Sequence, residues 1–314
     1  MERVVIVAGT ILLTAVIGGW FLTAHVRDDD SMRNRFNLLS GMDKPVAWIY
    51  VNDADVNSRR WLDFGARSSH VMNVPFLNLC YQNIVRALPD YRVEVIGGLS
   101  DLAVRMGGWD SLPTPLRNPL AIVREPELNW IRAAVLAKWG GLWVSPSTVF
   151  LKRFDEMPTE KTVFFGSDDE VTFVGNGGTA PALRVVWAPA PDLPLWVSWE
   201  QKVRARLETR AGGSEFRRDE KSDTADALRE FASVVEVRPH AELTRHKGKR
   251  IQLEDILAAG QDGVLPFSIE GASFMPIAWP EILERRAFGW FLRLNEEQIL
   301  NSDLAIRWIL QKLE

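Results

Sequence analysis

The sequence predicts an α/β domain with a mixed, mostly parallel sheet that is flanked by helices and preceded by one transmembrane helix. First, the chain of 314 residues is 46% hydrophobic and 25% charged, which is ordinary globular composition. Second, two strand-like segments, residues 46–51 and 91–97, enclose a helix-like one, residues 76–88. Third, an uncharged apolar run, residues 4–24, precedes them. Because strand–helix–strand units join parallel strands, helices are expected on the faces of this sheet.

The apolar run at the N-terminus has the length of a membrane-spanning helix. Its roughly 21 residues would rise about 30 Å as a helix, which matches the hydrocarbon core of a bilayer. A cleaved signal peptide and a buried helix are the alternatives; against the first, Leu22 stands where a small residue would be needed. We therefore expect an anchor at residues 1–25, a polar linker at residues 26–43 and a folded domain at residues 44–314.

Basic residues on either side of this run predict its orientation. Arg3 precedes the run, whereas Arg27, Arg33, Arg35 and Lys44 follow it. Since the flank richer in Lys and Arg stays in the cytoplasm, the folded domain is expected there, on a single-pass membrane protein.

Charge and cysteine content exclude several classes of function. The net charge of -4 and the pI near 5.7 give no global basic field, so nucleic acid is not an expected partner. The only cysteine, Cys80, excludes an internal disulfide. One Cys and four His also show no zinc-site spacing.

The elements of the domain follow one another from residue 46. The first strand ends at the turn-forming residues 52–57, and Pro75 opens the first helix. A second helix begins at Pro126 and ends before the pair Gly140-Gly141. Further strands are expected at residues 142–144, 162–166, 171–175 and 183–190, and a further helix at residues 194–210. Near the C-terminus, Asn295 and Gln298 form a capping pattern before the apolar stripe Ile299, Leu300, Leu304 and Trp308.

Polar residues around the second helix indicate a ligand site. Asn129 and Arg132 are three apart and therefore neighbours on one helix face. The following strand carries Ser145 and Ser147 to the edge of the sheet, where open α/β sheets bind ligands. The alternative is that Pro146 ends the strand and both serines satisfy local backbone groups.

The stretch of residues 128–155 resembles the core motif of glycosyltransferases with a DXD sugar-binding region. This superfamily includes capsular polysaccharide transferases, yeast-type mannosyltransferases and clostridial glucosylating toxins. Its motif runs Asp, an Arg three residues later, a Gly-Gly pair, a strand residue and Asp-X-Asp. The matching positions are Arg132, Gly140 and Gly141. Neutral residues replace the family's carboxylates at Asn129, Ser145 and Ser147. Residues 48–69 also resemble the first strand and donor-binding loop of capsular-type relatives, so the similarity covers residues 46–155.

The resemblance implies a GT-A-like fold and transfer of a sugar from a nucleotide-sugar donor to a glycan or lipid-linked acceptor. It assigns Arg132 to the donor sugar or diphosphate and Asn129 to a sugar hydroxyl. Ser145 and Ser147 are expected at the diphosphate or ribose. The nucleoside is expected to contact Asn52, Asp53 and Asp55.

The two serines make binding of the family's metal ion unfavourable at this position. Mg²⁺ and Mn²⁺ prefer anionic oxygen ligands, and two hydroxyls do not replace the charge of two carboxylates. No metal site is therefore predicted, although the family uses a divalent metal. Fixed cations, for example in the basic run at residues 245–250, would have to neutralise the diphosphate instead. Such a run is otherwise a solvated loop or a contact with anionic lipid.

Two further interpretations remain open at this point. Carboxylates could come from elsewhere, either from Asp53 and Asp55 or from the acidic residues 168–170, although short acidic residues after strands commonly form turns. Within that group, Asp168 and Asp169 are the candidates for a general base that assists the acceptor hydroxyl. Alternatively, the domain is a degenerate transferase that binds a sugar or a partner without turnover.

Tryptophan is abundant, and three of the 13 tryptophans lie near the suspected site. They are Trp130, Trp139 and Trp143. Aromatic rings stack on sugars and nucleobases, but they also fill cores, so either role is open for each ring.

Overall fold

The computed structural model describes residues 44–52, 74–155, 160–172, 179–209, 229–260 and 264–313. The chain divides into two units between Lys44 and Pro45, and every described residue except Lys44 belongs to the second unit. The expected anchor at residues 1–25 and linker at residues 26–43 lie outside the described residues. Across the ranges that are described, none of the helices has the length and apolar character needed to span a bilayer.

A six-stranded sheet in the order β2-β1-β3-β8-β5-β9 forms the centre of the second unit. Its strands are β1 (Val46–Val51), β2 (Arg92–Gly97), β3 (Gly141–Val144), β5 (Thr162–Phe164), β8 (Val185–Ala188) and β9 (Val235–Val237). Strand β1 pairs in parallel with both β2 and β3, and β5 pairs in parallel with β9. Only β8 is antiparallel to its neighbours β3 and β5. The predicted mixed, mostly parallel sheet is confirmed.

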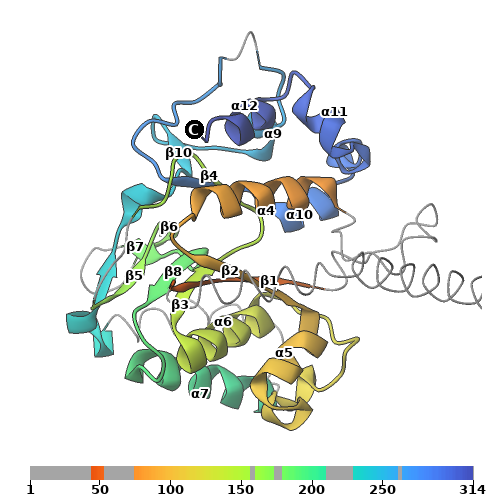
Figure 1. The fold of residues 1–314 in the computed structure, drawn as a ribbon. Helices are drawn as coiled ribbons and strands as arrows, with labels where there is room; N and C mark the ends of the chain where they lie inside the picture. Colours follow the sequence, from red (N-terminus) through yellow and green to blue (C-terminus); the bar gives the residue numbers. More distant parts are fainter. Residues whose placement is uncertain are drawn as a thin grey trace, which may run out of the picture. The chain divides into compact units, whose positions relative to one another are not determined.

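Helices cover both faces of this sheet (Figure 1). One face carries α5 (Gly98–Met106), α6 (Glu125–Trp139) and α7 (Pro194–Thr209). The other carries α4 (Pro75–Ala87), and beyond it α9 (Leu253–Ile256), α10 (Trp279–Glu284), α11 (Glu296–Leu300) and α12 (Ala305–Gln311). The 3-10 turns are η2 (Trp109–Ser111), η3 (Thr114–Leu116), η4 (Ala232–Val234), η5 (Pro239–Ala241), η6 (Arg286–Phe288) and η7 (Phe291–Arg293).

Three short strand pairs lie outside the main sheet. They are β4 (Thr148–Phe150) with β12 (Phe274–Pro276), β6 (Ser167–Thr172) with β7 (Thr179–Pro181), and β10 (Arg245–His246) with β11 (Lys249–Arg250). Each pair is antiparallel. Strand β4 follows β3 after a short turn, whereas its partner β12 comes from the C-terminal part of the chain.

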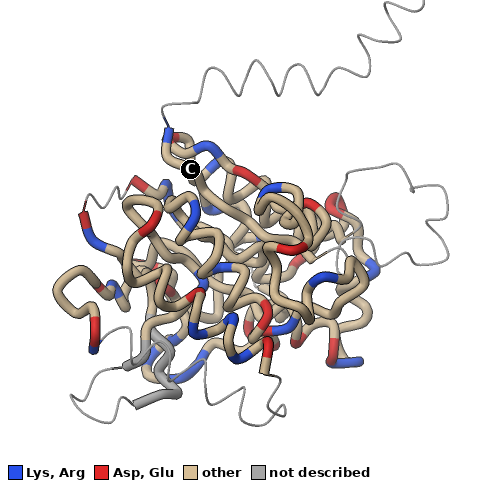
Figure 2. The backbone as a smooth tube through the Cα atoms, turned by 90° about the horizontal axis from the view of Figure 1, so that it is seen from below, with Lys and Arg blue, Asp and Glu red and all other residues tan. Residues whose placement is uncertain are grey.

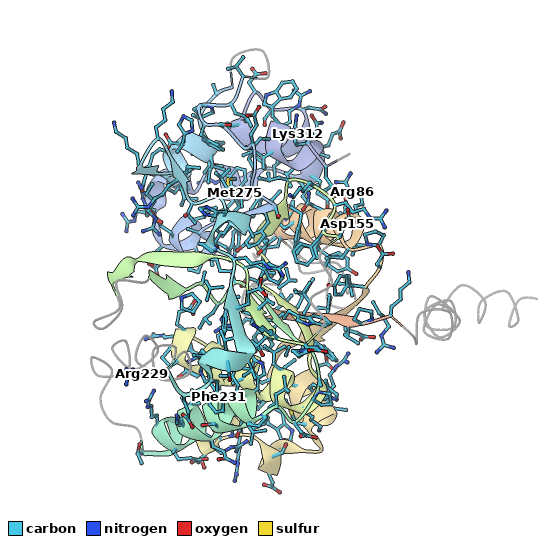
Figure 3. All side chains as sticks on the ribbon, turned by 90° about the vertical axis from the view of Figure 1, so that its left-hand side faces the viewer. Arg86, Asp155, Arg229, Phe231, Met275 and Lys312 are labelled. Atoms are coloured by element: carbon cyan, nitrogen blue, oxygen red, sulfur yellow. The ribbon has the colours of Figure 1, made fainter. Side chains whose placement is uncertain are left out.

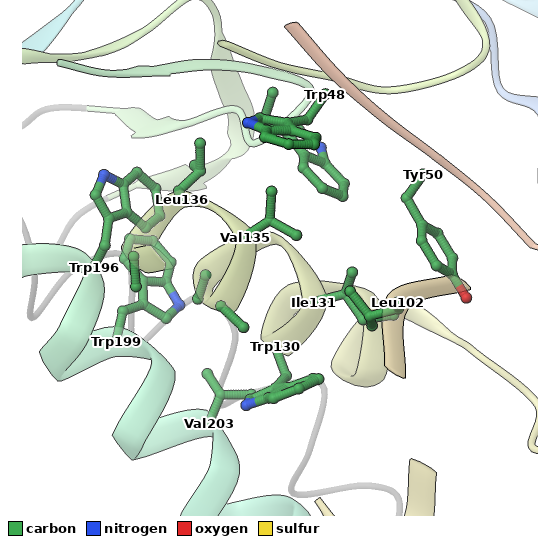
Figure 4. Packing of buried hydrophobic residues seen from close by; sticks show 14 of the residues in the cluster. Trp48, Tyr50, Leu102, Trp130, Ile131, Val135, Leu136, Trp196, Trp199 and Val203 are labelled. Carbon is green, nitrogen blue, oxygen red and sulfur yellow. The ribbon is translucent and has the colours of Figure 1, made fainter. Parts of the chain in front are cut away.

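The alternation of side chains along the strands builds a core on each face. From β1, Trp48 and Tyr50 join the core under α6, whereas Ile49 and Val51 join the core under α4. Figure 4 shows Trp196 and Trp199 of α7 beside α6 in the first of these cores, and both rings also pack on Phe164 of β5, with centroids 6.0 and 6.3 Å apart. Helix α7 thus lies beside α6 on the same face of the sheet.

A third core belongs to the C-terminal part of the chain. It packs α4 and β4 against β12 and the helices α9 to α12. In Figure 3, Met275 lies among these elements, whereas Phe231 lies beside the α7 side of the sheet. The C-terminal residues therefore extend the layer on the α4 face.

Most predicted elements are confirmed, but several short elements were not predicted. The strand–helix–strand unit is present, with Val46 paired to Arg92 in parallel register. The elements missed include α5, β4, β9, β10, β11, β12, α9 and α10, which are short. The strand expected at residues 171–175 instead begins at Ser167. The C-terminal apolar stripe is divided between α11 and α12, and Asn295 caps α11 as predicted.

Charged residues of both signs are interspersed over the described backbone (Figure 2). This distribution agrees with the small net charge of -4. Many of the opposite charges are close in sequence or paired, for example Arg285 with Glu281 at 2.7 Å. Local groups of charges, rather than a field of one sign, are therefore the electrostatic features to consider.

Candidate functional site

Two of the predicted ligand residues emerge at the same edge of the sheet. Strand β1 ends at Val51 and is followed by Asn52, whereas β3 ends at Val144 and is followed by Ser145. The two strands are adjacent and parallel, with Trp48 opposite Trp143. Their carboxyl ends therefore meet at one edge, which is where open α/β sheets bind ligands.

The glycine pair before β3 is required by a close approach to β1. Gly140 and Gly141 have φ angles of 64° and 94°, which are unfavourable for residues with a Cβ. A Cβ on Gly141 would lie 2.5 Å from the carbonyl oxygen of Val46. The indole Nε1 of Trp48 also donates to the carbonyl of Gly140 at 2.9 Å. The predicted chain reversal is confirmed, and it fixes the start of β3 against β1.

Asn129 and Arg132 are neighbours on α6, as their spacing predicts. The Arg132 Nη1 donates to Asn129 Oδ1 at 3.3 Å. The guanidinium also lies over the ring of Trp143, with its Cζ 5.6 Å from the ring centroid. Trp143 precedes Ser145 by two residues on β3, so Arg132 lies beneath the end of that strand.

The burial of this pair differs from the expectation of an open ligand mouth. Asn129 and Arg132 are each only 3% exposed. The reason is the position of α6, which is buried from residue 129 to residue 137 because the sheet covers one face and α7 another. The face that Asn129 and Arg132 share is therefore covered by protein and is not an exposed polar face of the helix.

The Ser-Pro-Ser segment forms the turn that joins β3 to β4. The amide of Thr148 donates to the carbonyl of Ser145 at 3.1 Å, which closes a turn with Pro146 at its second position. The hydroxyl of Ser147 donates to the carbonyl of Ile277 at 2.8 Å. The amide of Ile277 in turn donates to the carbonyl of Ser147 at 3.0 Å. Ser147 therefore satisfies a backbone group, as the alternative predicts, but that group is distant in sequence and not local.

Strand β4 is held in place on both sides, which fixes the turn before it. One side pairs with β12, so that Phe150 lies opposite Phe274. On the other side, Asn83 of α4 accepts a hydrogen bond from the amide of Phe150 at 2.7 Å and donates to its carbonyl at 3.0 Å. The Asn83 side chain thus replaces a neighbouring strand, and Ser145 stands on a rigid support.

Sequence reasoning missed an arginine and a glutamate beside Ser145. The amide of Ser145 donates to the carbonyl of Arg184 at 2.8 Å. The Nη1 of Arg184 lies 2.7 Å from Oε1 of Glu242. Arg184 was visible only as part of a predicted strand, and Glu242 is 58 positions away from it in sequence. No local pattern could have joined the two, because the contact exists only in the folded sheet.

The remaining candidate residues are placed less completely. Asp53 and Asp55 lie outside the described residues. Asp168 and Asp169 belong to the backbone of β6, next to the main sheet, but their side chains lie outside what the structure describes. The acidic run therefore follows β5 as expected, yet it forms a strand of its own where a loop was expected.

The basic run forms an exposed hairpin. Strands β10 and β11 pair Arg245 with Arg250, and Lys247 and Gly248 turn the chain with φ angles of 50° and 79°. This hairpin is separate from the six-stranded sheet that carries Ser145. Among the side chains that the structure describes, no group of three or more His, Cys, Asp or Glu is placed to hold a metal ion.

The tryptophans near the site fill the core. Trp130 is 1% exposed and donates from Nε1 to Glu200 at 2.7 Å. Trp139 packs on Trp48, with ring centroids 5.1 Å apart. Trp143 is 1% exposed beneath Arg132. Of the two roles left open for these rings, the structure supports packing.

Neither protein-family models nor curated proteins give a match to this chain. What the site can do must therefore be argued from its own residues. They provide a backbone edge with Asn52 and Ser145, a buried arginine under that edge and a second arginine beside it. Oriented N–H donors and hydroxyls of this kind suit an anionic ligand such as a phosphate.

Proposed function

We propose that this protein is a membrane-anchored glycosyltransferase-like protein with a GT-A-like fold. In this proposal it transfers a sugar from a nucleotide-sugar donor to a glycan or lipid-linked acceptor. The observation that carries the proposal is the common edge of β1 and β3, where Asn52 and Ser145 follow adjacent parallel strands. The mixed sheet with one inserted antiparallel strand is compatible with the proposed fold.

The roles of the donor-site residues combine what the resemblance implies with the positions of those that the structure describes. Ser145 would contact the diphosphate or ribose from the strand edge, and Asn52 the nucleoside, together with Asp53 and Asp55. Arg132 would supply positive charge beneath the edge, with Asn129 orienting its guanidinium. Ser147 is the weakest member of the set, because its hydroxyl already donates to a backbone carbonyl.

The chemistry of the proposed transfer needs charge stabilisation on the donor side and a base on the acceptor side. Fixed cations and hydroxyls would stabilise the diphosphate as negative charge develops on it. No metal ion bound at the two serines is needed for this. Asp168 or Asp169 would accept the proton of the acceptor hydroxyl. The N-terminal apolar run would hold the domain at the cytoplasmic surface of a membrane.

A second candidate function is a non-catalytic module that binds a sugar or a partner. Two observations favour it over turnover. Arg132 and Asn129 are almost completely covered, each at 3% exposure, and Ser147 is engaged in holding the segment after β12. Both features are those of residues that stabilise a fold.

Calorimetry of the full-length protein in detergent against UDP-sugars and GDP-sugars, with and without Mn²⁺, separates these functions. Binding of a donor in the absence of Mn²⁺ supports the transferase with fixed cations. Binding that appears only with Mn²⁺ would show that the metal-independent version is wrong. If no donor binds, the transferase proposal fails and the binding module takes its place.

The role of Arg132 needs a variant that keeps the buried volume. Arg132→Met fills most of the same space and removes the charge, so near-UV circular dichroism should show the native fold. We expect donor affinity to fall by roughly tenfold or more, as for loss of a charged hydrogen bond. Unchanged donor affinity in a folded Arg132→Met protein would remove Arg132 from the site.

A further inference from the structure

Arg184 stands directly opposite Ser145 at the ligand edge of the sheet. The last register pair between β3 and β8 joins Val144 to Val185, so the next pair along is Ser145 with Arg184. The amide of Ser145 confirms this register by donating to the carbonyl of Arg184 at 2.8 Å. Opposite residues of an antiparallel pair have their Cβ atoms about 4.5–5.5 Å apart. The two side chains therefore start side by side.

The same register assigns both side chains to the face that carries Arg132. Side chains alternate along a strand, so Ser145 follows Trp143, and Arg184 precedes Val186, on one face of the sheet. Trp143 and Val186 both belong to the core under α6. Since the Arg132 guanidinium lies over Trp143, two arginines and a serine gather at one end of this face.

A buried carboxylate holds the Arg184 guanidinium. The Nη1 of Arg184 lies 2.7 Å from Oε1 of Glu242, and the side chains are 36% and 1% exposed respectively. Glu242 in turn lies against Gly166, which has a φ of 142° and no room for a Cβ beside this carboxylate. The pair thus has a buried carboxylate that packs against the backbone at Gly166 and an arginine that reaches solvent.

We propose that Arg184 binds the diphosphate of the donor, and that Glu242 is its positioning residue. This inference rests on the proposed function. It assigns the fixed positive charge that must neutralise the diphosphate, because the two serines do not provide the carboxylates that would hold a metal ion. A guanidinium has five N–H donors in a planar fork, and the carboxylate engages one edge of it. In the described part of the chain, Glu242 is the only side-chain partner of Arg184. The Arg184 side chain is 36% exposed and starts beside Ser145, so its remaining donors are available to two phosphate oxygens in this proposal.

The test compares binding of inorganic pyrophosphate, UDP, GDP and the nucleosides uridine and guanosine to the full-length protein in detergent. Arg184→Ala should weaken pyrophosphate and nucleotide binding by about tenfold to a hundredfold and leave nucleoside binding unchanged. Arg184→Lys keeps the charge but not the fork, so the loss should be smaller, about threefold to tenfold.

Arg204→Ala is the matched control for loss of an arginine–glutamate pair. Its guanidinium also lies 2.7 Å from a carboxylate, that of Glu200, and its side chain is 33% exposed. It lies on α7, away from the strand edge. Arg204 also donates to the carbonyl of Ser111 at 2.8 Å and lies over the ring of Trp130. Arg204→Ala should bind every ligand as the wild type does, although its melting temperature should fall at least as far as that of Arg184→Ala.

Glu242→Gln tests whether the pair takes part in ligand binding, because a purely structural ion pair would leave pyrophosphate affinity unchanged. The amide oxygen still accepts from Arg184, but a negative charge beside the phosphate is removed. Pyrophosphate affinity should therefore rise, by about threefold at low salt, and the gain should shrink as salt is added. A structural ion pair predicts no change in affinity.

The outcomes separate the two proposals. If the wild type binds UDP or GDP and Arg184→Ala binds them equally well, Arg184 is not the diphosphate residue, while the proposed function stands. If the wild type binds neither nucleotides nor pyrophosphate, both proposals fail. A decrease in affinity that is equal in Arg184→Ala and Arg204→Ala would show a general loss of stability and would also overturn the assignment.

Discussion

Replacing Asn83 by alanine should detach β4 from α4. Asn83 is 0% exposed, and its side-chain amide makes two hydrogen bonds with the backbone of Phe150, at 2.7 and 3.0 Å. Phe150 lies opposite Phe274 in β12 at a position where these backbone groups point away from that strand. No other strand lies on that side, so Asn83 alone completes the hydrogen bonding of Phe150 within the described chain.

The size of the effect follows from the two backbone groups that lose their partner. A buried donor or acceptor without a hydrogen bond costs roughly 1–3 kcal/mol, so Asn83→Ala should lower the free energy of unfolding by about 4 kcal/mol. At about 2–4 °C per kcal/mol for a domain of this size, the melting temperature should fall by roughly 8–16 °C.

Thermal melting followed by circular dichroism measures this difference. Gln82→Ala is the matched control, because it truncates an exposed amide on the preceding position of the same helix. Within the described chain its side chain makes one long hydrogen bond, to Glu296 at 3.4 Å, so its effect should stay within about 0.5 kcal/mol. A difference of ~2 °C in melting temperature corresponds to about 1 kcal/mol or less of unfolding free energy. If the two variants melt within ~2 °C of each other, Asn83 does not hold β4.

Three further changes test the fold around the site. Gly141→Ala should lower the free energy of unfolding, measured by urea titration, by about 2–3 kcal/mol or more. The reason is that Gly141 has a φ of 94° and that the added Cβ would lie 2.5 Å from a β1 carbonyl. Gly97→Ala is the neutral control, because a Cβ there meets nothing within 4 Å. Burial raises the pKa of the Cys80 thiol, so the folded state keeps its proton where the unfolded state loses it. Stability is therefore intact below pH ~8.5 and decreases above it, by up to about 1.4 kcal/mol per pH unit, and an equal decrease in Cys80→Ala would contradict this cause. Asn295→Ala should cost about 1 kcal/mol through loss of the α11 cap in the same titrations, and no loss would mean that α11 is held by packing alone.

Prediction from the sequence succeeded where a local pattern carries the structure. The strand at residues 46–51, the helix opened by Pro75 and the cap at Asn295 all follow from nearest neighbours in the chain. The pairing of Asn129 with Arg132 also follows from helical spacing alone. Their burial does not, because it depends on how α6 packs in the folded domain, where the Arg132 guanidinium lies over Trp143 of β3.

The sequence by itself determined most elements around the site, the parallel connection of β1 to β2 and the polar character of the turn at residues 145–147. The tertiary structure decided how each polar residue is used. It ties Ser147 to Ile277, packs Arg132 on Trp143, and brings Arg184 to Ser145 and Glu242. The physical reason is the range of the forces concerned. Helical period and turn preference act over a few residues, whereas burial and ion pairing depend on which distant segments the folded sheet brings together.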